Sequence, residues 1–186
     1  MRIIAGIYRS RTIITPKGDA TRPTTDRARE SLFNILSHSF DLDGIRVLDL
    51  FAGSGAFGLE ALSRGASHVT FVENDKKAIE AIAANIKAFE AENEASVVKL
   101  DVYKWLSGAS GAYDLVFADP PYDDERTLAK LPHILFSSGL LLPISVVICE
   151  HRTGSTIIPP SEVDILRVVT VGEAQFTLLK RKPATC

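Results

Sequence analysis

The sequence predicts an α/β protein built on a mostly parallel sheet that is covered by helices on both faces. Three observations lead to this fold class. Between residues 45 and 150, short β-rich runs alternate with segments of helical spacing. Those runs are almost continuously apolar, which is typical of strands buried on both faces. The chain has 186 residues, of which 46% are hydrophobic and 24% charged, as expected for one globular unit.

The first 40 residues predict a small appendage. Residues 2–8 and 11–15 are expected to form a β-hairpin with its turn near Arg9 and Ser10. Residues 16–23 contain a glycine and two prolines and predict a loop. A helix with apolar positions at helical spacing follows, and Thr24 or Thr25 is expected to cap it. We therefore divide the chain into an appendage, residues 1–40, and a main domain, residues 41–186.

The sequence of the main domain predicts five strands, three helices and a final hairpin. The strands are expected at residues 45–51, 68–73, 95–100, 113–119 and 140–150, and the helices at residues 57–64, from residue 76 onward, and at 125–136. Asp75 is expected to cap the second of these helices. Residues 164–171 and 174–181 predict a hairpin hinged at Gly172, which would add an antiparallel edge to the sheet.

Charge is distributed unevenly along the chain. The net charge is −2 and the pI is about 6.1, which on its own argues against a general nucleic-acid binder. Residues 1–30, however, hold seven basic and three acidic residues, a net charge of +4, while the remaining residues carry −6. The amino-terminal end is therefore predicted to meet a polyanion that the acidic body does not attract.

Cysteines, histidines and apolar runs exclude several classes of protein. Cys149 and Cys186 form no metal-ligand cluster with histidines, so we expect no metal site and a reducing compartment. His38, His68, His133 and His151 show no triad or metal spacing and are expected at the surface or at helix caps. No signal peptide is expected, and residues 140–149, the longest apolar run, are too few to span a membrane. We predict a cytoplasmic protein.

A glycine loop at residues 49–58 lies between a predicted strand and a helix. Gly53, Gly55 and Gly58 let the backbone turn sharply and approach a ligand, although they also suit a plain tight turn. Glu73 ends the next strand, where a carboxylate accepts ribose hydroxyls. To this point an NAD-dependent dehydrogenase fits as well as any other enzyme. Asp49 favours a different ligand, because it would repel a pyrophosphate but suits the cationic groups of S-adenosylmethionine.

Asp101 follows the third predicted strand, and two roles remain open for it. Its carboxylate could accept a hydrogen bond from an adenine amino group. It could equally cap a helix that begins at Val102.

A second motif, at residues 119–122, follows the fourth strand. Because ligands in open α/β sheets bind beyond the carboxyl ends of the strands, this motif and the glycine loop are expected to share one crevice. Asp119 and the Pro120 carbonyl offer two acceptors for an NH₂ group, held in place by Pro120 and Pro121. Tyr122 offers a flat face on which an unpaired or flipped base can stack. This arrangement predicts methyl transfer to an exocyclic amine.

These residues resemble the amino-methyltransferases that depend on S-adenosylmethionine. The resemblance to the RsmD family is more specific and extends over nearly the whole chain, at residues 2–6, 22–34, 48–55, 59–65 and 72–75. It implies a Rossmann-like fold with a seven-stranded sheet and a catalytic domain at residues 41–186. It also implies methylation of guanine N2 in 16S ribosomal RNA, in a small-subunit particle. We expect a monomer, the default for a small enzyme that acts on a large substrate.

The resemblance also implies roles for individual residues. Those lining the methionine end of S-adenosylmethionine would be Asp49, Phe51, Gly53 and Gly55, while Glu73 would hold the ribose and Asp101 the adenine. The target amine would be held by Asp119, Pro120, Pro121 and Tyr122. The residues beside the RNA would be Arg2, Arg9, Arg11, Arg22, Thr24, Arg27 and Arg29. The alternatives are a DNA adenine-N6 methyltransferase, for which the chain has little room, and a non-catalytic RNA-binding assembly factor on the same fold.

Overall fold

The computed structural model describes residues 1–16, 26–121 and 125–183. Seven strands form one sheet in the order β3-β2-β1-β4-β5-β7-β6. Their bounds are β1 Arg46–Leu50, β2 His68–Glu73, β3 Ala95–Lys99, β4 Tyr113–Ala118, β5 Leu141–Arg152, β6 Val163–Val171 and β7 Ala174–Arg181. The first five pair in parallel, whereas β7 pairs antiparallel with both β5 and β6. The predicted parallel sheet and its antiparallel carboxy-terminal hairpin are confirmed.

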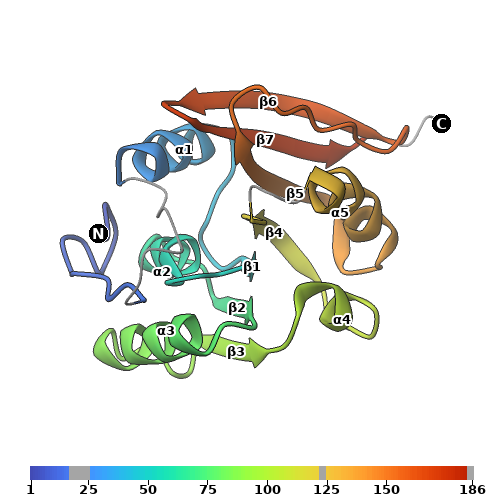
Figure 1. The fold of residues 1–186 in the computed structure, drawn as a ribbon. Coiled ribbons are helices and arrows are strands. Elements are labelled where there is room, and N and C mark those ends of the chain that lie inside the picture. Colours follow the sequence, from blue (N-terminus) through green and yellow to red (C-terminus); the bar gives the residue numbers. More distant parts are fainter. Residues whose placement is uncertain (17–25, 122–124, 184–186) are drawn as a thin grey trace.

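Within these described ranges, five helices cover the two faces of the sheet (Figure 1). Their bounds are α1 Asp26–Ser39, α2 Ala56–Ser63, α3 Lys76–Ala88, α4 Val102–Leu106 and α5 Glu125–Ser137. Leu32, Leu59 and Ile82 place α1, α2 and α3 over the core of one face. Val102 and Leu131 place α4 and α5 over the core of the other face. We call the first of these the α1–α3 face.

Asp75 caps α3 as predicted, since its carboxylate accepts a hydrogen bond from the Ala78 amide at 2.9 Å. The predicted cap of α1 at Thr24 or Thr25 lies outside the described residues. The short helix α4 begins at Val102, as the capping role predicted for Asp101 requires.

The amino-terminal segment pairs with itself less than predicted. Instead of two strands it forms a single antiparallel bridge between Arg2 and Thr12, and the chain between them bends and turns. Side chains of α2 explain the difference, because Glu60 accepts hydrogen bonds from the amides of Ile4 and Ala5 at 2.8 and 3.1 Å. A hairpin ladder cannot use amides that already donate to another element.

The appendage shares its core with the main domain. Ile3 and Ile13 are 2% exposed and pack in the same cluster as Leu32 of α1 and Leu59 of α2. One histidine also lies deeper than expected. His151 is 3% exposed and its Nε2 lies 2.8 Å from the Thr177 hydroxyl, so its prediction as a surface or capping residue was wrong.

Candidate active site

Carboxylates gather where the parallel strands end. Glu73 is the last residue of β2, Asp49 is the fourth of five residues in β1, and Asp119 follows β4 directly. Because the sheet order is β2-β1-β4-β5, these three strands are neighbours. The sequence predicted this convergence. It did not predict a fourth carboxylate, Glu150 of β5, whose only sequence signal is an acid at the end of an apolar run.

The four carboxylates also share the α1–α3 face. Side chains alternate along a strand, so residues two apart point the same way. Phe71, Phe117 and Ile148 belong to the core on the α1–α3 face. The residues two positions after these three are, in the same order, Glu73, Asp119 and Glu150. Val47 relates to Asp49 in the same way. All four acids therefore lie on one face of the sheet, where its parallel strands end.

The glycine loop after β1 has backbone angles that favour glycine. The φ angles of Gly53 and Gly55 are 55° and 75°, in the left-handed region. A Cβ at Gly55 would also lie 3.1 Å from the Phe71 ring. Phe51 takes a φ of 56° without being glycine, a strain that is commonly held at binding sites. At Gly53 and Gly55 the loop therefore has no side chain to cover its backbone.

Asp49 braces the first turn of α2. It is 2% exposed, and its Oδ2 accepts a hydrogen bond from the Gly58 amide at 2.9 Å. The amide of the third helical residue ordinarily donates to the side chain of the N-cap residue, three positions earlier. Here the N-cap is Gly55, which has no side chain. Burial raises the pKa of Asp49 from 3.8 to about 8; nearby Glu73 adds to the increase and the Gly58 amide opposes it.

Glu73 holds three backbone amides. Its Oε2 accepts a hydrogen bond from Gly53 at 2.9 Å, and its Oε1 accepts from Asn74 and Asp75, both at 2.8 Å. A carboxylate has about four acceptor positions, so about one remains for a ligand in this arrangement. Glu73 therefore ties the glycine loop to β2 and can still accept from a hydroxyl group.

Asp119 and Pro120 stand at the head of the second motif. The Asp119 amide lies 3.4 Å from the Leu50 carbonyl of β1, which fixes the start of the motif beside the glycine loop. Burial raises the pKa of Asp119 well above its usual range, and the charges of Glu150 and Asp49 raise it further. Pro120 is buried and Pro121 exposed, while Tyr122 lies outside the described residues.

Asp101 takes the second of its two predicted roles. Its Oδ1 accepts a hydrogen bond from the Lys104 amide at 2.9 Å, so it caps α4. Asp101 is exposed at the end of β3, and its contact with an adenine stays a prediction.

Apart from Arg29, the predicted RNA-facing residues fall into three groups. Arg2, Arg9 and Arg27 are exposed, whereas Arg22 and Thr24 lie outside the described residues. Arg11 is exposed but held, since its Nη1 donates to the Ala88 carbonyl at 3.2 Å and its guanidinium lies 5.3 Å from the centre of the Tyr8 ring. Among the interactions that the structure describes, the exposed side chains of Arg2, Arg9 and Arg27 make no contact of the kind that holds Arg11.

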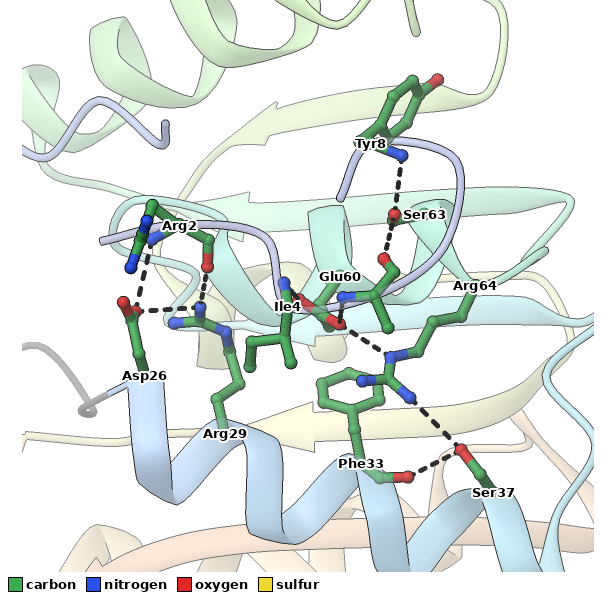
Figure 2. A network of polar contacts seen from close by, with 11 residues as sticks. Arg2, Ile4, Tyr8, Asp26, Arg29, Phe33, Ser37, Glu60, Ser63 and Arg64 are labelled. Atoms are coloured by element: carbon green, nitrogen blue, oxygen red, sulfur yellow. Dashed lines mark hydrogen bonds and ion pairs between the residues drawn. The ribbon is translucent and has the colours of Figure 1, made fainter. Parts of the chain in front are cut away.

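Arg29 does not contact RNA in this arrangement, which corrects its prediction. Its side chain is 0% exposed, its Nη2 pairs with Asp26 at 3.1 Å, and the same nitrogen donates to the Arg2 carbonyl (Figure 2). The two other guanidinium nitrogens, Nε and Nη1, are buried without a hydrogen-bond partner. The residue therefore joins α1 to the amino-terminal segment from inside the protein.

The same close view shows how α2 holds that segment (Figure 2). Besides receiving the amides of Ile4 and Ala5, Glu60 forms an ion pair with Arg64 at 2.7 Å. The Ser63 hydroxyl accepts a hydrogen bond from the Tyr8 amide at 2.9 Å. In the last turn of α3, the Asn85 side chain bonds both polar backbone groups of Ile14 and the Ser54 carbonyl of the glycine loop, at 2.7 to 3.1 Å.

The fold and this arrangement define a class, the Rossmann-like methyltransferases. Across residues 1–16, 26–121 and 125–183, no group of three or more metal-ligating side chains is found. None of the helices in the same ranges is long and apolar enough to cross a membrane.

The chain belongs to the RsmD family. Residues 1–180 match the family model described as conserved hypothetical protein 95. Ribosomal RNA small subunit methyltransferase D of Escherichia coli K12 is 33% identical over 183 residues, which cover 98% of this chain and 90% of the relative. The counterpart of Haemophilus influenzae is 32% identical over 181 residues, covering 96% and 92%.

Solved structures agree with this placement. The structure of yhhF from Escherichia coli has a TM-score of 0.86 at 33% identity and covers 98% of both chains. SMU.776, solved in complex with S-adenosylhomocysteine, has a TM-score of 0.68 at 18% identity and covers 82% of this chain and 49% of its own. At that identity the second likeness shows the fold alone.

Proposed function

We propose that this protein transfers a methyl group from S-adenosylmethionine to the N2 amine of a guanine in 16S ribosomal RNA. The observation that carries the proposal is the placement of Asp119 beside a glycine loop that is flanked by the buried carboxylates Asp49 and Glu73. The names of the Escherichia coli and Haemophilus influenzae relatives point to small-subunit ribosomal RNA as the acceptor. We further propose that the protein acts as a monomer in the cytoplasm, on a small-subunit particle.

The crevice fits the cofactor chemically. The backbone of Gly53 and Gly55 leaves room for a ligand, and the free acceptor position of Glu73 suits a ribose hydroxyl. Asp49 provides a buried negative charge for a cationic ligand when it is ionised. S-adenosylmethionine supplies, when bound, an activated methyl group on a positively charged sulfur. Phe51 would line the same end of the cofactor, and Asp101 would lie near its adenine.

The second motif prepares the acceptor amine. An exocyclic amine on a base is a poor nucleophile because its lone pair is delocalised into the ring. Asp119 and the Pro120 carbonyl accept hydrogen bonds from its two N–H groups and so localise the lone pair, while Tyr122 stacks on the base. Asp119 does this best when ionised, although burial raises its pKa in the free protein. Positive charge nearby, on the cofactor or on the amine as it is methylated, favours that ionised form.

The exposed cations of the amino-terminal end guide the RNA. We propose that Arg2, Arg9 and Arg27 contact phosphates, together with Arg22 and Thr24. Arg11 would contribute its charge from a fixed position over Tyr8. The hydrogen bonds from α2 and α3 to the segment hold Arg2 and Arg9 in place relative to the body of the protein.

Mass mapping of ribosomal RNA tests the proposal. Cells that lack the protein should lose one N2-methylguanosine from 16S RNA, and the wild-type gene should restore it. The variant Asp119→Ala should not restore it, yet should bind S-adenosylmethionine in calorimetry, because the motif holds the acceptor and not the cofactor. Asp164→Ala, an exposed acid of β6, is the matched control and should restore the modification. An unchanged 16S map, or full restoration by Asp119→Ala, contradicts the proposal.

A further inference from the structure

Glu150 is a buried carboxylate beside the second motif that the mechanism above does not use. It is 3% exposed, which is comparable with the 2% of Asp49 and the 8% of Glu73 in the same crevice. Cys149 of β5 pairs with Ala118 of β4, so Glu150 lies level with Asp119 on the neighbouring strand. Both side chains belong to the α1–α3 face, as the core positions two residues before them show.

Electrostatics also indicates that the carboxylates of Glu150 and Asp119 lie close together. The charge of Glu150 raises the pKa of Asp119, next in effect after burial itself. On its other side, Glu150 pairs in register with Phe176 of β7, whose ring is fully buried. The carboxylate is therefore shielded from water on the side of β7 and lies near the group that would grip the acceptor amine.

The chemistry of guanine gives this position a use. On the Watson–Crick edge of guanine, the N2 amine is next to N1–H, so two kinds of donor lie side by side. Adenine carries an unprotonated N1 there, whose lone pair would repel an acceptor that faces it. We infer that Glu150 accepts the N1–H of the target base and thereby selects guanine, an inference that rests on the proposed function. Asp119 and Pro120 would hold the amine while Glu150 reads the atom beside it.

Burial makes such a contact selective. A hydrogen bond to an ionised carboxylate is stronger than one between neutral groups, and more so away from water. A base without N1–H would leave the buried carboxylate facing a lone pair. We therefore expect loss of the contact to change the rate of methylation by about tenfold or more, which corresponds to about 1.4 kcal/mol.

The test combines a protein variant with a changed base. A short RNA carries either guanine or 2-aminopurine at the position mapped by the experiment above. 2-Aminopurine keeps the amine at C2 but has no hydrogen on N1. The measurement is kcat/KM of methyl transfer to each RNA, for the wild-type protein and for Glu150→Gln. Glu60→Gln, another buried carboxylate but on α2, is the matched control.

The wild-type protein should prefer guanine over 2-aminopurine by about tenfold or more, and Glu150→Gln should remove most of that preference. Glu60→Gln should lower both rates alike and keep the ratio. An unchanged ratio in Glu150→Gln overturns the inference while the proposed function stands. If the wild-type protein methylates neither RNA nor the small-subunit particle, the proposed function fails, and the inference with it. Should Glu150→Gln not fold, as thermal melting would show, Glu150→Asp replaces it and should lower the ratio by shortening the side chain.

Discussion

Asp49→Asn should stabilise the ligand-free protein at neutral pH. The unfolded chain ionises Asp49 with a pKa of 3.8, whereas burial in the fold raises that pKa to about 8. Since folding raises the pKa, ionisation costs stability at every pH above 3.8, and the cost grows until the pH passes about 8. At pH 7 the cost has an upper limit of about 4 kcal/mol, and at pH 5 of about 1.6 kcal/mol. Asparagine removes the cost and keeps an oxygen for the Gly58 amide.

Thermal melting at two pH values measures this effect. Relaxation of the protein makes the real cost smaller than this upper limit. If the cost at pH 7 is half of the limit, about 2 kcal/mol, removing it would raise Tm by about 4 to 8 °C. The increase should be clearly smaller at pH 5, because less of the ionisation cost is present there. Asp164→Asn, whose side chain is 53% exposed, is the control and should leave Tm within about 1 °C.

Ligand binding should respond in the opposite direction. Asp49 gains a cationic neighbour when S-adenosylmethionine binds, so the variant should lose affinity in calorimetry although it is more stable. A Tm that does not rise at pH 7, or that rises equally at pH 5, refutes the argument from buried ionisation. Unchanged affinity for the cofactor refutes the placement of its positive charge beside Asp49.

Three further predictions concern the anchoring of the amino-terminal segment and one buried thiol. Gly6→Ala should release that segment and speed its cleavage by trypsin, because a Cβ there lies 1.6 Å from the Ser63 carbonyl oxygen; Gly44→Ala, also at positive φ but with open space around it, should not. Asn85→Ala should cost about 3 kcal/mol in urea unfolding, since it leaves the polar backbone groups of Ile14 unpaired, whereas exposed Asn93→Ala should cost less than about 0.5 kcal/mol. Cys149 should resist iodoacetamide in the native protein at pH 8.5, because burial raises its pKa to about 12, and rapid labelling would contradict its burial.

The sheet and its helices could be predicted because each carries a pattern that burial imposes. Apolar runs at residues 68–73 and 113–119 became β2 and β4 almost without change, and Asp75 caps α3 as its position before an apolar stripe indicated. The same strand ends delivered Asp49, Glu73 and Asp119 to one edge, since parallel strands end together. Local pattern and general topology are sufficient for these features.

Features that depend on partners far away in the sequence could not be predicted. Residues 2–8 have the composition of a strand, yet Glu60 captures two of their amides from a helix more than fifty residues later. Arg29 looks like a surface cation in sequence and is 0% exposed, because it meets both Asp26 and the Arg2 carbonyl inside the protein. Glu150 gave no usable signal, since only the register between β4 and β5 places it beside Asp119.

The uneven charge of the chain also has a different meaning once the site is considered. Counting ionisable groups makes the body strongly acidic, which would oppose the approach of RNA to the crevice. With a pKa of about 8, however, Asp49 is mostly protonated at neutral pH in the free protein, and Asp119 has its pKa raised as well. The crevice is therefore less negative than the sequence count suggests until a cation enters it. Binding of a positively charged cofactor would restore the charge of these carboxylates just where an acceptor amine needs them ionised, so that cofactor binding and acceptor binding should favour each other.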